Sequence, residues 1–218
     1  HETRLLTKDG RILDVVMKGR VYAEEEDAPA GEIVILRDIT HEKEIARNNE
    51  AVLRISMALP EYPDLEDLLD YITSEVKQLL VTEGALVILL DEEKGELFFM
   101  GAAYDDTDTQ KRIKEIRFPL DELVAGEVIR TGEPVIVSDT SENRDLHRER
   151  DKKLGYHTRN LLLVPLRSKD RIIGVLCAIN KKDEAFDQAN VELLNMVAAT
   201  VALSIENARF SEELKKAY

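Results

Sequence analysis

The amino-acid sequence predicts a fold of mixed α and β structure, and three observations support that prediction. Two apolar runs, Leu161–Leu166 and Ile172–Ile179, flank a short polar tip, which is typical of a β-hairpin made of two buried strands. A long helical pattern begins near Asp187, where apolar residues recur at three- and four-residue steps. A second helical stripe of apolar residues begins at Leu65 and continues to Leu80.

The composition describes a globular chain with an acidic surface. Its 218 residues suffice for one full core and a smaller unit, and 44% hydrophobic with 34% charged residues are typical of globular proteins. A net charge of -14 argues against nucleic acid or an anionic membrane as a direct partner. No apolar run approaches the roughly 20 residues that span a bilayer, so we expect no direct membrane contact. The chain begins at His1 rather than Met, so we expect a cytoplasmic piece of a longer protein, which can itself be membrane-bound.

The residues that could support metal, redox or hydrolytic chemistry are few. Cys177 is the only cysteine and lies within an apolar run, so we expect a buried, unreactive thiol and no disulfide. His147 and His157 could hold a metal ion together with Asp145 or Glu149, but isolated histidines are more often solvated. The sequence contains no GxSxG motif. We therefore expect no metal, no cofactor and no catalysis.

Residues 1–40 predict three strands. An Asp9-Gly10 turn separates the first two strands, and an acidic loop precedes a third that ends in Arg37-Asp38-Ile39-Thr40. This arrangement resembles the last three strands of a PAS domain. Because only about half of such a domain is present, we expect no ligand here, and an unpaired strand edge that favours pairing with another chain.

Residues 41–62 predict a signalling linker helix, with Thr40 as its N-cap and Pro60 near its end. One register of apolar residues alternates four- and three-residue steps and contains an asparagine, as the seam of a parallel dimer does. That seam comprises Ile45, Asn49, Val52, Ser56 and Leu59, and a second register comprises Ile45, Asn48, Val52, Ile55 and Leu59. The alternative is that the helix packs on its own domain.

The chain from residue 63 onward predicts an ordered series of short elements. Asp64 caps a helix that Gly84 ends, and a hairpin with its turn at residues 91–96 follows. The middle contains a polar segment at residues 105–111, a loop with a helix as the alternative, and a short strand at residues 116–118. A helix over 121–130 closed by Gly132 and a strand over 134–137 follow. A charged segment with a short helix at 146–154 then leads to the second hairpin and the long terminal helix.

This order of elements over residues 63–207 resembles a whole GAF domain, and the segment GEVIRTGEPVIVSDT is similar to the usual middle of that family. The resemblance implies an α+β fold: a GAF-like antiparallel sheet with helices on both faces, the first and last helices on one face and the variable helices on the other. The PAS-like strands and the linker helix precede this domain. Residues 208–218 would then form an exit helix toward an output domain.

The GAF resemblance includes part of a cyclic-nucleotide signature of the form NKxFxxxDE. Asn180-Lys181 and Phe186 match it, but Asn190 and Val191 stand where the signature has its acidic pair. In the family Lys181 would pair with the first acidic residue, so we expect no cyclic-nucleotide binding. A bilin pigment would need an attachment cysteine, and GAF-type methionine sulfoxide reductases use several cysteines.

In the family a small-molecule pocket lies between the sheet and the variable helices. The residues that the resemblance places there are Phe98, Met100, Phe118, Val137, Asp139, Leu146, Tyr156, His157, Arg159 and Leu163. Among them, Arg159 could meet an anionic group and Tyr156 could stack or donate a hydrogen bond. The alternative is that these residues simply fill the core.

These expectations together describe a non-catalytic sensory and dimerisation module of a bacterial signalling protein, such as a histidine kinase of a two-component system. Its partners would be a second copy of the chain, an unidentified small molecule and a covalently linked output domain. Three alternatives remain: a ligand-free dimerisation spacer, a small enzyme on a GAF scaffold, and a cyclic-nucleotide-binding domain.

Overall fold

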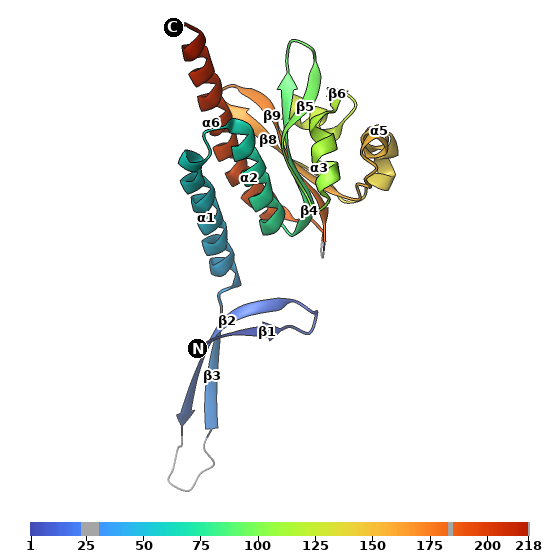
Figure 1. Cartoon of the computed structure of the whole chain (residues 1–218). Coiled ribbons are helices and arrows are strands. Elements are labelled where there is room, and N and C mark those ends of the chain that lie inside the picture. The colour runs from blue at the N-terminus through green and yellow to red at the C-terminus, as the bar shows by residue number, and fades with distance from the viewer. Residues whose placement is uncertain (23–30, 183–184, 218) are drawn as a thin grey trace. The chain divides into compact units, whose positions relative to one another are not determined.

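The computed structural model describes residues 1–22, 31–182 and 185–217, with backbone alone for residues 22 and 142–147 (Figure 1). These residues fall into two compact units, His1–Glu50 and Ala51–Tyr218, and the boundary lies within the first helix. The larger unit contains the helices and hairpins predicted from residue 63 onward. It is the unit that holds the candidate site.

The first unit is a three-stranded antiparallel sheet in the order β1-β2-β3, made of β1 (Glu2–Leu6), β2 (Ile12–Tyr22) and β3 (Gly31–Asp38). Successive residues of β3, from Ile33 to Leu36, are exposed, so apolar side chains project from both faces of this strand. Helix α1 (Thr40–Ala58) follows. The expectation that Thr40 caps this helix is wrong, because the carboxylate of Asp38 accepts the Thr40 N–H at 2.9 Å and Thr40 is already helical.

The second half of α1 belongs to the larger unit and packs on its own domain. Ala51, Ile55 and Ala58 are buried, and Ile55 belongs to the main hydrophobic core. Val52 and Leu59, two residues of the expected dimer seam, are half-buried against the same core. This part of the predicted seam therefore packs against the core of its own domain, which is the alternative to a dimer seam given above.

A six-stranded antiparallel sheet organises the larger unit, in the order β6-β5-β4-β9-β8-β7. The two predicted hairpins are present as neighbouring strand pairs, β4 with β5 and β8 with β9, and β4 pairs with β9 at the centre. The strands are β4 (Thr82–Asp91), β5 (Glu96–Tyr104), β6 (Arg117–Pro119), β7 (Val135–Val137), β8 (Leu161–Ser168) and β9 (Arg171–Lys181).

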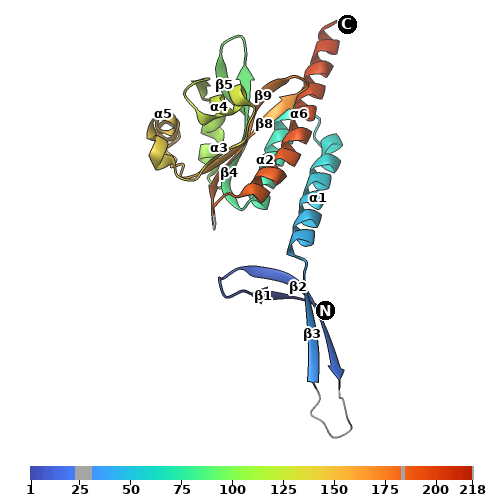
Figure 2. The ribbon, with the colours of Figure 1, turned by 180° about the vertical axis from the view of Figure 1, so that it is seen from behind.

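Helices cover both faces of this sheet, in the arrangement that the GAF resemblance implies (Figures 1 and 2). On one face α2 (Leu65–Leu79) and α6 (Gln188–Ala217) form the main core with inward residues of β4, β8 and β9. On the other face lie α3 (Thr107–Lys114), α4 (Val124–Thr131) and α5 (Arg144–Leu154). Two short 3₁₀ turns, η1 (Leu59–Glu61) and η2 (Thr140–Asn143), connect neighbouring elements.

The ends of the helices follow from local sequence, with one correction. Asp64 caps α2 by accepting the N–H groups of Glu66 and Asp67, and Gly132 ends α4 in the left-handed conformation with φ 70°. Gly84 does not end α2, because the helix stops at Leu79 and Gly84 already lies within β4. The chain reverses instead at Val81, whose φ of 53° is unusual for a β-branched residue.

Helix α6 is long and apolar enough to cross a membrane by length and composition alone. Within this structure 44% of its most apolar stretch is buried, and residues such as Leu194 and Val201 pack in the core beneath the sheet. The core helix of a globular domain has these same properties.

Candidate functional site

A polar cavity of about 600 Å³ lies beside α5, on the face of the sheet that carries the variable helices. We call it the α5 cavity. Its lining side chains come from the segment after β7, from α5, and from the segment before β8. They are Ser138, Asp139, Thr140, Ser141, Arg148, Asp151, His157, Thr158 and Arg159.

The inner wall of the α5 cavity is held by hydrogen bonds between α5 and the segment before β8. The two carboxylate oxygens of Asp151 accept the N–H and the hydroxyl of Thr158 at 2.8 and 2.7 Å. Behind this pair Arg150, only 3% exposed, donates from Nη2 to Thr158 Oγ1 at 2.8 Å. The hydroxyl of Thr140 donates a hydrogen bond to the carbonyl oxygen of Thr158. This bond connects the segment after β7 to the segment before β8. A buried cation therefore lies directly behind a wall of ordered polar groups.

A second network connects the α5 cavity to the central strands, and its hub is Glu83 of β4. The carboxylate accepts hydrogen bonds from Arg159 Nη2 at 2.7 Å, from the Tyr156 hydroxyl at 2.7 Å and from Asn180 Nδ2 at 3.0 Å. Partial burial raises the pKa of Glu83, but these three donors outweigh it and hold the pKa below its ordinary value. Asn180, the penultimate residue of β9, also accepts the backbone N–H of Arg159 at 2.6 Å.

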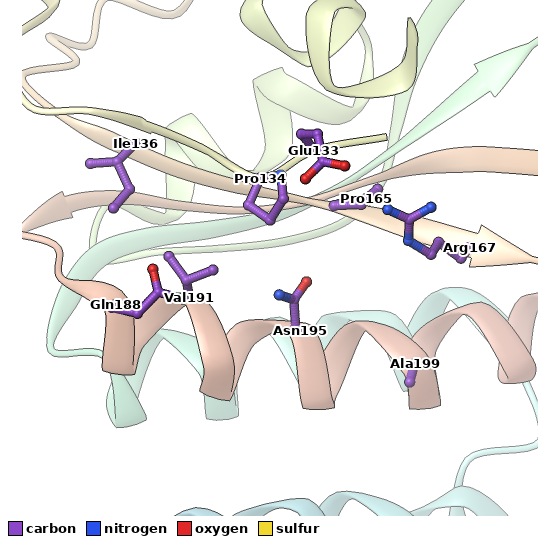
Figure 3. A pocket seen from close by; sticks show the side chains of 9 residues that line it. All are labelled: Glu133, Pro134, Ile136, Pro165, Arg167, Gln188, Val191, Asn195 and Ala199. Carbon is purple, nitrogen blue, oxygen red and sulfur yellow. The ribbon is translucent and has the colours of Figure 1, made fainter. Parts of the chain in front are cut away.

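A groove of about 840 Å³ lies on the opposite face, between α6 and the β7–β8 edge of the sheet. We call it the α6 groove. Figure 3 shows Val191 and Asn195 pointing from α6 toward Pro134 and Pro165 across this groove. Because helix and sheet edge are not in full contact here, this side of α6 is incompletely packed.

Comparison with known proteins shows the family to which this domain belongs. The family model for the GAF domain matches residues 63–206. The chain belongs to the GAF domain family. GAF domains are sensory and ligand-binding modules of signalling proteins.

Curated relatives of this GAF domain include much longer proteins. A probable 3',5'-cyclic phosphodiesterase of Caenorhabditis elegans, pde-5, is 28% identical over 103 residues, which are 47% of this chain and 14% of that protein. The dual 3',5'-cyclic-AMP and -GMP phosphodiesterase 11A of Takifugu rubripes is 34% identical over 107 residues, 48% of this chain and 12% of that protein. The alignments thus cover about half of this chain and a small part of the relatives.

Solved structures show the same fold. The GAF domain of an Acinetobacter phosphoenolpyruvate-protein phosphotransferase superposes with a TM-score of 0.65 at 20% identity, over 77% of this chain and 98% of that one. A phycocyanobilin-bound GAF domain of a cyanobacterial phytochrome superposes with a TM-score of 0.61 at 18% identity, over 75% and 96% of the two chains. At these identities the likeness concerns the fold alone.

The GAF structure brings together some of the ten expected pocket residues and separates others. Asp139, His157 and Arg159 line the α5 cavity, and Tyr156 lies next to them in the Glu83 network. Phe118, Val137 and Leu163 instead pack in the core beneath α3 and α4, which is what the filled-core alternative holds for them. The side chain of Leu146 lies outside the described residues.

Phe98 and Met100 require a correction, because they lie on the other face of the sheet, against the core formed with α2 and α6. Phe98 and Met100 share one face because β5 alternates regularly as far as Met100, and Leu97 and Phe99 face the other core. The register shift between the pairs Ile88–Phe99 and Val87–Gly101 changes the alternation after Met100, so Ala102 and Tyr104 pack in the core on the opposite face from Met100.

Sequence reasoning missed the charged residues Glu83, Arg148, Arg150 and Asp151 of this site, and also the hydroxyl-bearing residues Ser138, Thr140, Ser141 and Thr158. Arg148 and Asp151 are three residues apart and therefore share one side of α5, which was an available signal. Nothing local in the sequence indicates Glu83, which meets Arg159 across 76 positions of the chain.

The residues of the cyclic-nucleotide signature have structural roles in this GAF domain. Lys181 Nζ donates to the backbone oxygen of Leu80 at 2.8 Å, beyond the end of α2. Asn190 and Asp187 exchange side-chain-to-backbone hydrogen bonds at 3.1 and 2.9 Å, which is a capping box at the start of α6. Asn190 therefore stabilises a helix end.

Two buried polar side chains lie deeper in the same GAF core. Tyr104 is 4% exposed, and its hydroxyl has no hydrogen-bond partner within the part of the chain that the structure describes. Its ring packs edge-on against Tyr156 at 5.1 Å. Burial raises the pKa of the Cys177 thiol to about 12, as expected for an unreactive cysteine. Among the described residues, no group of three or more His, Cys, Asp or Glu side chains is placed to hold a metal ion.

Proposed function

We propose that this chain is a non-catalytic sensory and dimerisation module of a bacterial signalling protein. In this proposal the GAF domain binds a small molecule in the α5 cavity and transmits the event through its terminal helices. The main support is the path from cavity to exit helix. Arg159 lines the cavity and donates a hydrogen bond to Glu83. Glu83 also accepts a hydrogen bond from Asn180, which lies at the end of β9, the strand that precedes α6.

The proposal places the dimer seam mainly along α6, where the exposed residues follow a heptad. Met196, Leu203 and Phe210 are seven residues apart and 39%, 60% and 63% exposed. Thr200, Asn207 and Leu214 fall between them at alternating four- and three-residue steps, so the seam has an asparagine at one of its inner positions. The small residues Ala198 and Ala202 are buried in the domain's own core and do not belong to this seam.

On the linker helix the proposal uses a different side from the expected one. Because Val52 and Leu59 pack inward, the exposed apolar residues of α1 in the larger unit are Leu53 and Met57, at 59% and 68% exposure. The N-terminal strands would belong to a PAS-like domain completed by chain outside residues 1–218. A covalently attached output domain, such as that of a histidine kinase, would follow α6, and the assembly would act in the cytoplasm.

The dimer is tested by sedimentation equilibrium on matched variants of one helix. Leu203→Asp places a charge in the seam and should raise the dimer dissociation constant at least tenfold. Ala208→Asp introduces an aspartate on α6 at a half-buried position outside the seam and should leave the constant within about twofold. A wild-type monomer at tens of micromolar, or equal effects of both variants, would overturn the proposed seam.

Transmission is tested by the distance between spin labels attached at Ser211 of the two copies. Glu83→Gln removes the charge at the hub of the network and should shift this distance. Glu92→Gln alters a surface carboxylate that pairs with Arg171 and should not shift it. An unchanged distance in the Glu83 variant, with the dimer intact, would make the fragment a passive spacer rather than a transmitter.

A further inference from the structure

The α5 cavity contains more available hydrogen-bond donors than acceptors. Arg148 is exposed and lines the cavity, and its guanidinium makes no ion pair or hydrogen bond with any residue that the structure describes. The ring of His157 is 82% exposed at the cavity rim, and its Nδ1 lies 3.9 Å from Asp151. Arginine presents five N–H donors and no acceptor, so this side of the cavity is suited to a ligand that accepts hydrogen bonds.

The carboxylates near the cavity are already engaged within the chain. Both oxygens of Asp151 accept hydrogen bonds from Thr158, and Asp139 accepts the backbone N–H of Ser141 at 2.8 Å. Glu83 is engaged by Arg159, Tyr156 and Asn180. These acids consequently order the walls, and a ligand would find few acceptors there for its own donors.

A buried positive charge lies behind the inner wall. Arg150 is 3% exposed and reaches the cavity wall through its hydrogen bond to Thr158, while Asp151 Oδ1 lies 3.6 Å from its guanidinium. In a chain of net charge -14, three arginines lie at or directly behind this one polar cavity. Arg159 pairs with Glu83 and Arg150 lies near Asp151, whereas Arg148 has no counter-ion among the described residues. A cation without a counter-ion attracts a ligand of opposite charge, and water screens a buried charge less than an exposed one.

From this donor excess and the arginines at this cavity we infer that the α5 cavity recognises a small anion, an organic acid or a phosphate compound. Arg148 and His157 contact the anionic group at the rim, and Arg150 acts through the ordered Thr158–Asp151 wall. This inference rests on the proposed sensory role of the cavity and names the chemical class of its ligand. A carboxylate or phosphate oxygen would accept from the arginine in bidentate geometry.

The test follows the arginine side-chain Nε–Hε resonances of the protein by NMR at constant ionic strength. The probes are inorganic phosphate, succinate and, as a neutral match for succinate, succinamide. Phosphate or succinate should shift the Arg148 resonance in a saturable way, and succinamide should not. Arg148→Gln should raise the dissociation constant at least tenfold, whereas Arg171→Gln, which changes an exposed arginine in the β8–β9 hairpin, should leave it unchanged.

Three outcomes would overturn the assignment. If succinamide produced shifts as large as succinate does, the cavity would bind ligands without regard to charge, and its proposed sensory role would stand. If no anion shifted Arg148 more than Arg171, the cavity would not be an anion site. If Arg148→Gln bound both anions as tightly as the wild type, recognition would lie elsewhere. The spin-label measurement at Ser211 judges the sensory role independently of all three.

Discussion

Glu83→Gln tests the network that connects the cavity to the central strands. The carboxylate of Glu83 accepts three hydrogen bonds from Arg159, Tyr156 and Asn180 at 2.7 to 3.0 Å, and its side chain is 28% exposed. A buried hydrogen bond to a charged group contributes about 1.5–3 kcal/mol and an exposed ion pair at most about 1 kcal/mol. For this half-exposed set we expect a loss of about 2 kcal/mol in the free energy of unfolding at pH 7. For a chain of this size that loss lowers Tm by about 4–8 °C.

The pH dependence gives a second check with a definite sign. Because the folded protein holds the pKa of Glu83 below its ordinary 4.5, the ionised carboxylate stabilises the fold above that pH. The wild-type advantage over Glu83→Gln should therefore shrink as pH falls below about 4.5. Urea denaturation at pH 7 and at pH 4 measures both effects. Glu92, 57% exposed, is the matched control, and Glu92→Gln should change stability by less than about 0.5 kcal/mol. Equal effects of the two substitutions at pH 7 would refute the reasoning.

Three further predictions concern the core, the start of α6 and ligand choice. Tyr104→Phe should raise the free energy of unfolding by about 1 kcal/mol in urea denaturation, because it removes a buried hydroxyl that has no partner among the described residues; a loss of stability would reveal an unseen partner. Asp187→Ala should lower that free energy by about 1 kcal/mol through loss of the α6 cap, and a neutral result would contradict the capping role. Calorimetric titration with cyclic AMP and cyclic GMP should show no binding at micromolar concentrations, because Asn190 caps α6 and Lys181 donates a hydrogen bond to the backbone oxygen of Leu80. Measurable binding heat at micromolar concentrations would show that the missing acidic pair is dispensable.

The types and order of the elements were predictable because they depend on local periodicity. The run Leu161–Leu166 and its partner Ile172–Ile179 form the β8–β9 hairpin, and Asp64 and Gly132 cap the helices expected for them. Each of these signals lies within a few residues of the structure it specifies. The placement of helices on the two faces came from the family resemblance, since periodicity does not state which helix covers which face.

The candidate site was only partly predictable. Asp139, His157 and Arg159 were placed at the cavity because family order puts their segments there. Phe98 and Met100 were misplaced because β5 has apolar residues on both of its faces, so its sequence does not show which face meets which helices. A one-residue bulge after Met100 also changes the alternation of faces along the strand. Val52 and Leu59, which were expected in a dimer seam, pack against the domain's own core for a similar reason. Helices α1 and α6 carry apolar residues on several sides, and only packing decides which stripe remains exposed.

The sequence by itself determined most of the helices, the hairpins, the Asp64 and Gly132 caps and the mixed α and β class, because hydrophobic period and turn chemistry act over short stretches of chain. It did not determine α3, which lies where a polar loop was expected, or the start of α1. Only the tertiary structure decided the parity of β5, the exposed heptad of α6 and the contacts of Glu83. Glu83 meets Arg159 and Asn180 across 76 and 97 positions of the chain. Such contacts form when β4 pairs with β9, and no local pattern specifies them, because they depend on the register of strands that are distant in sequence.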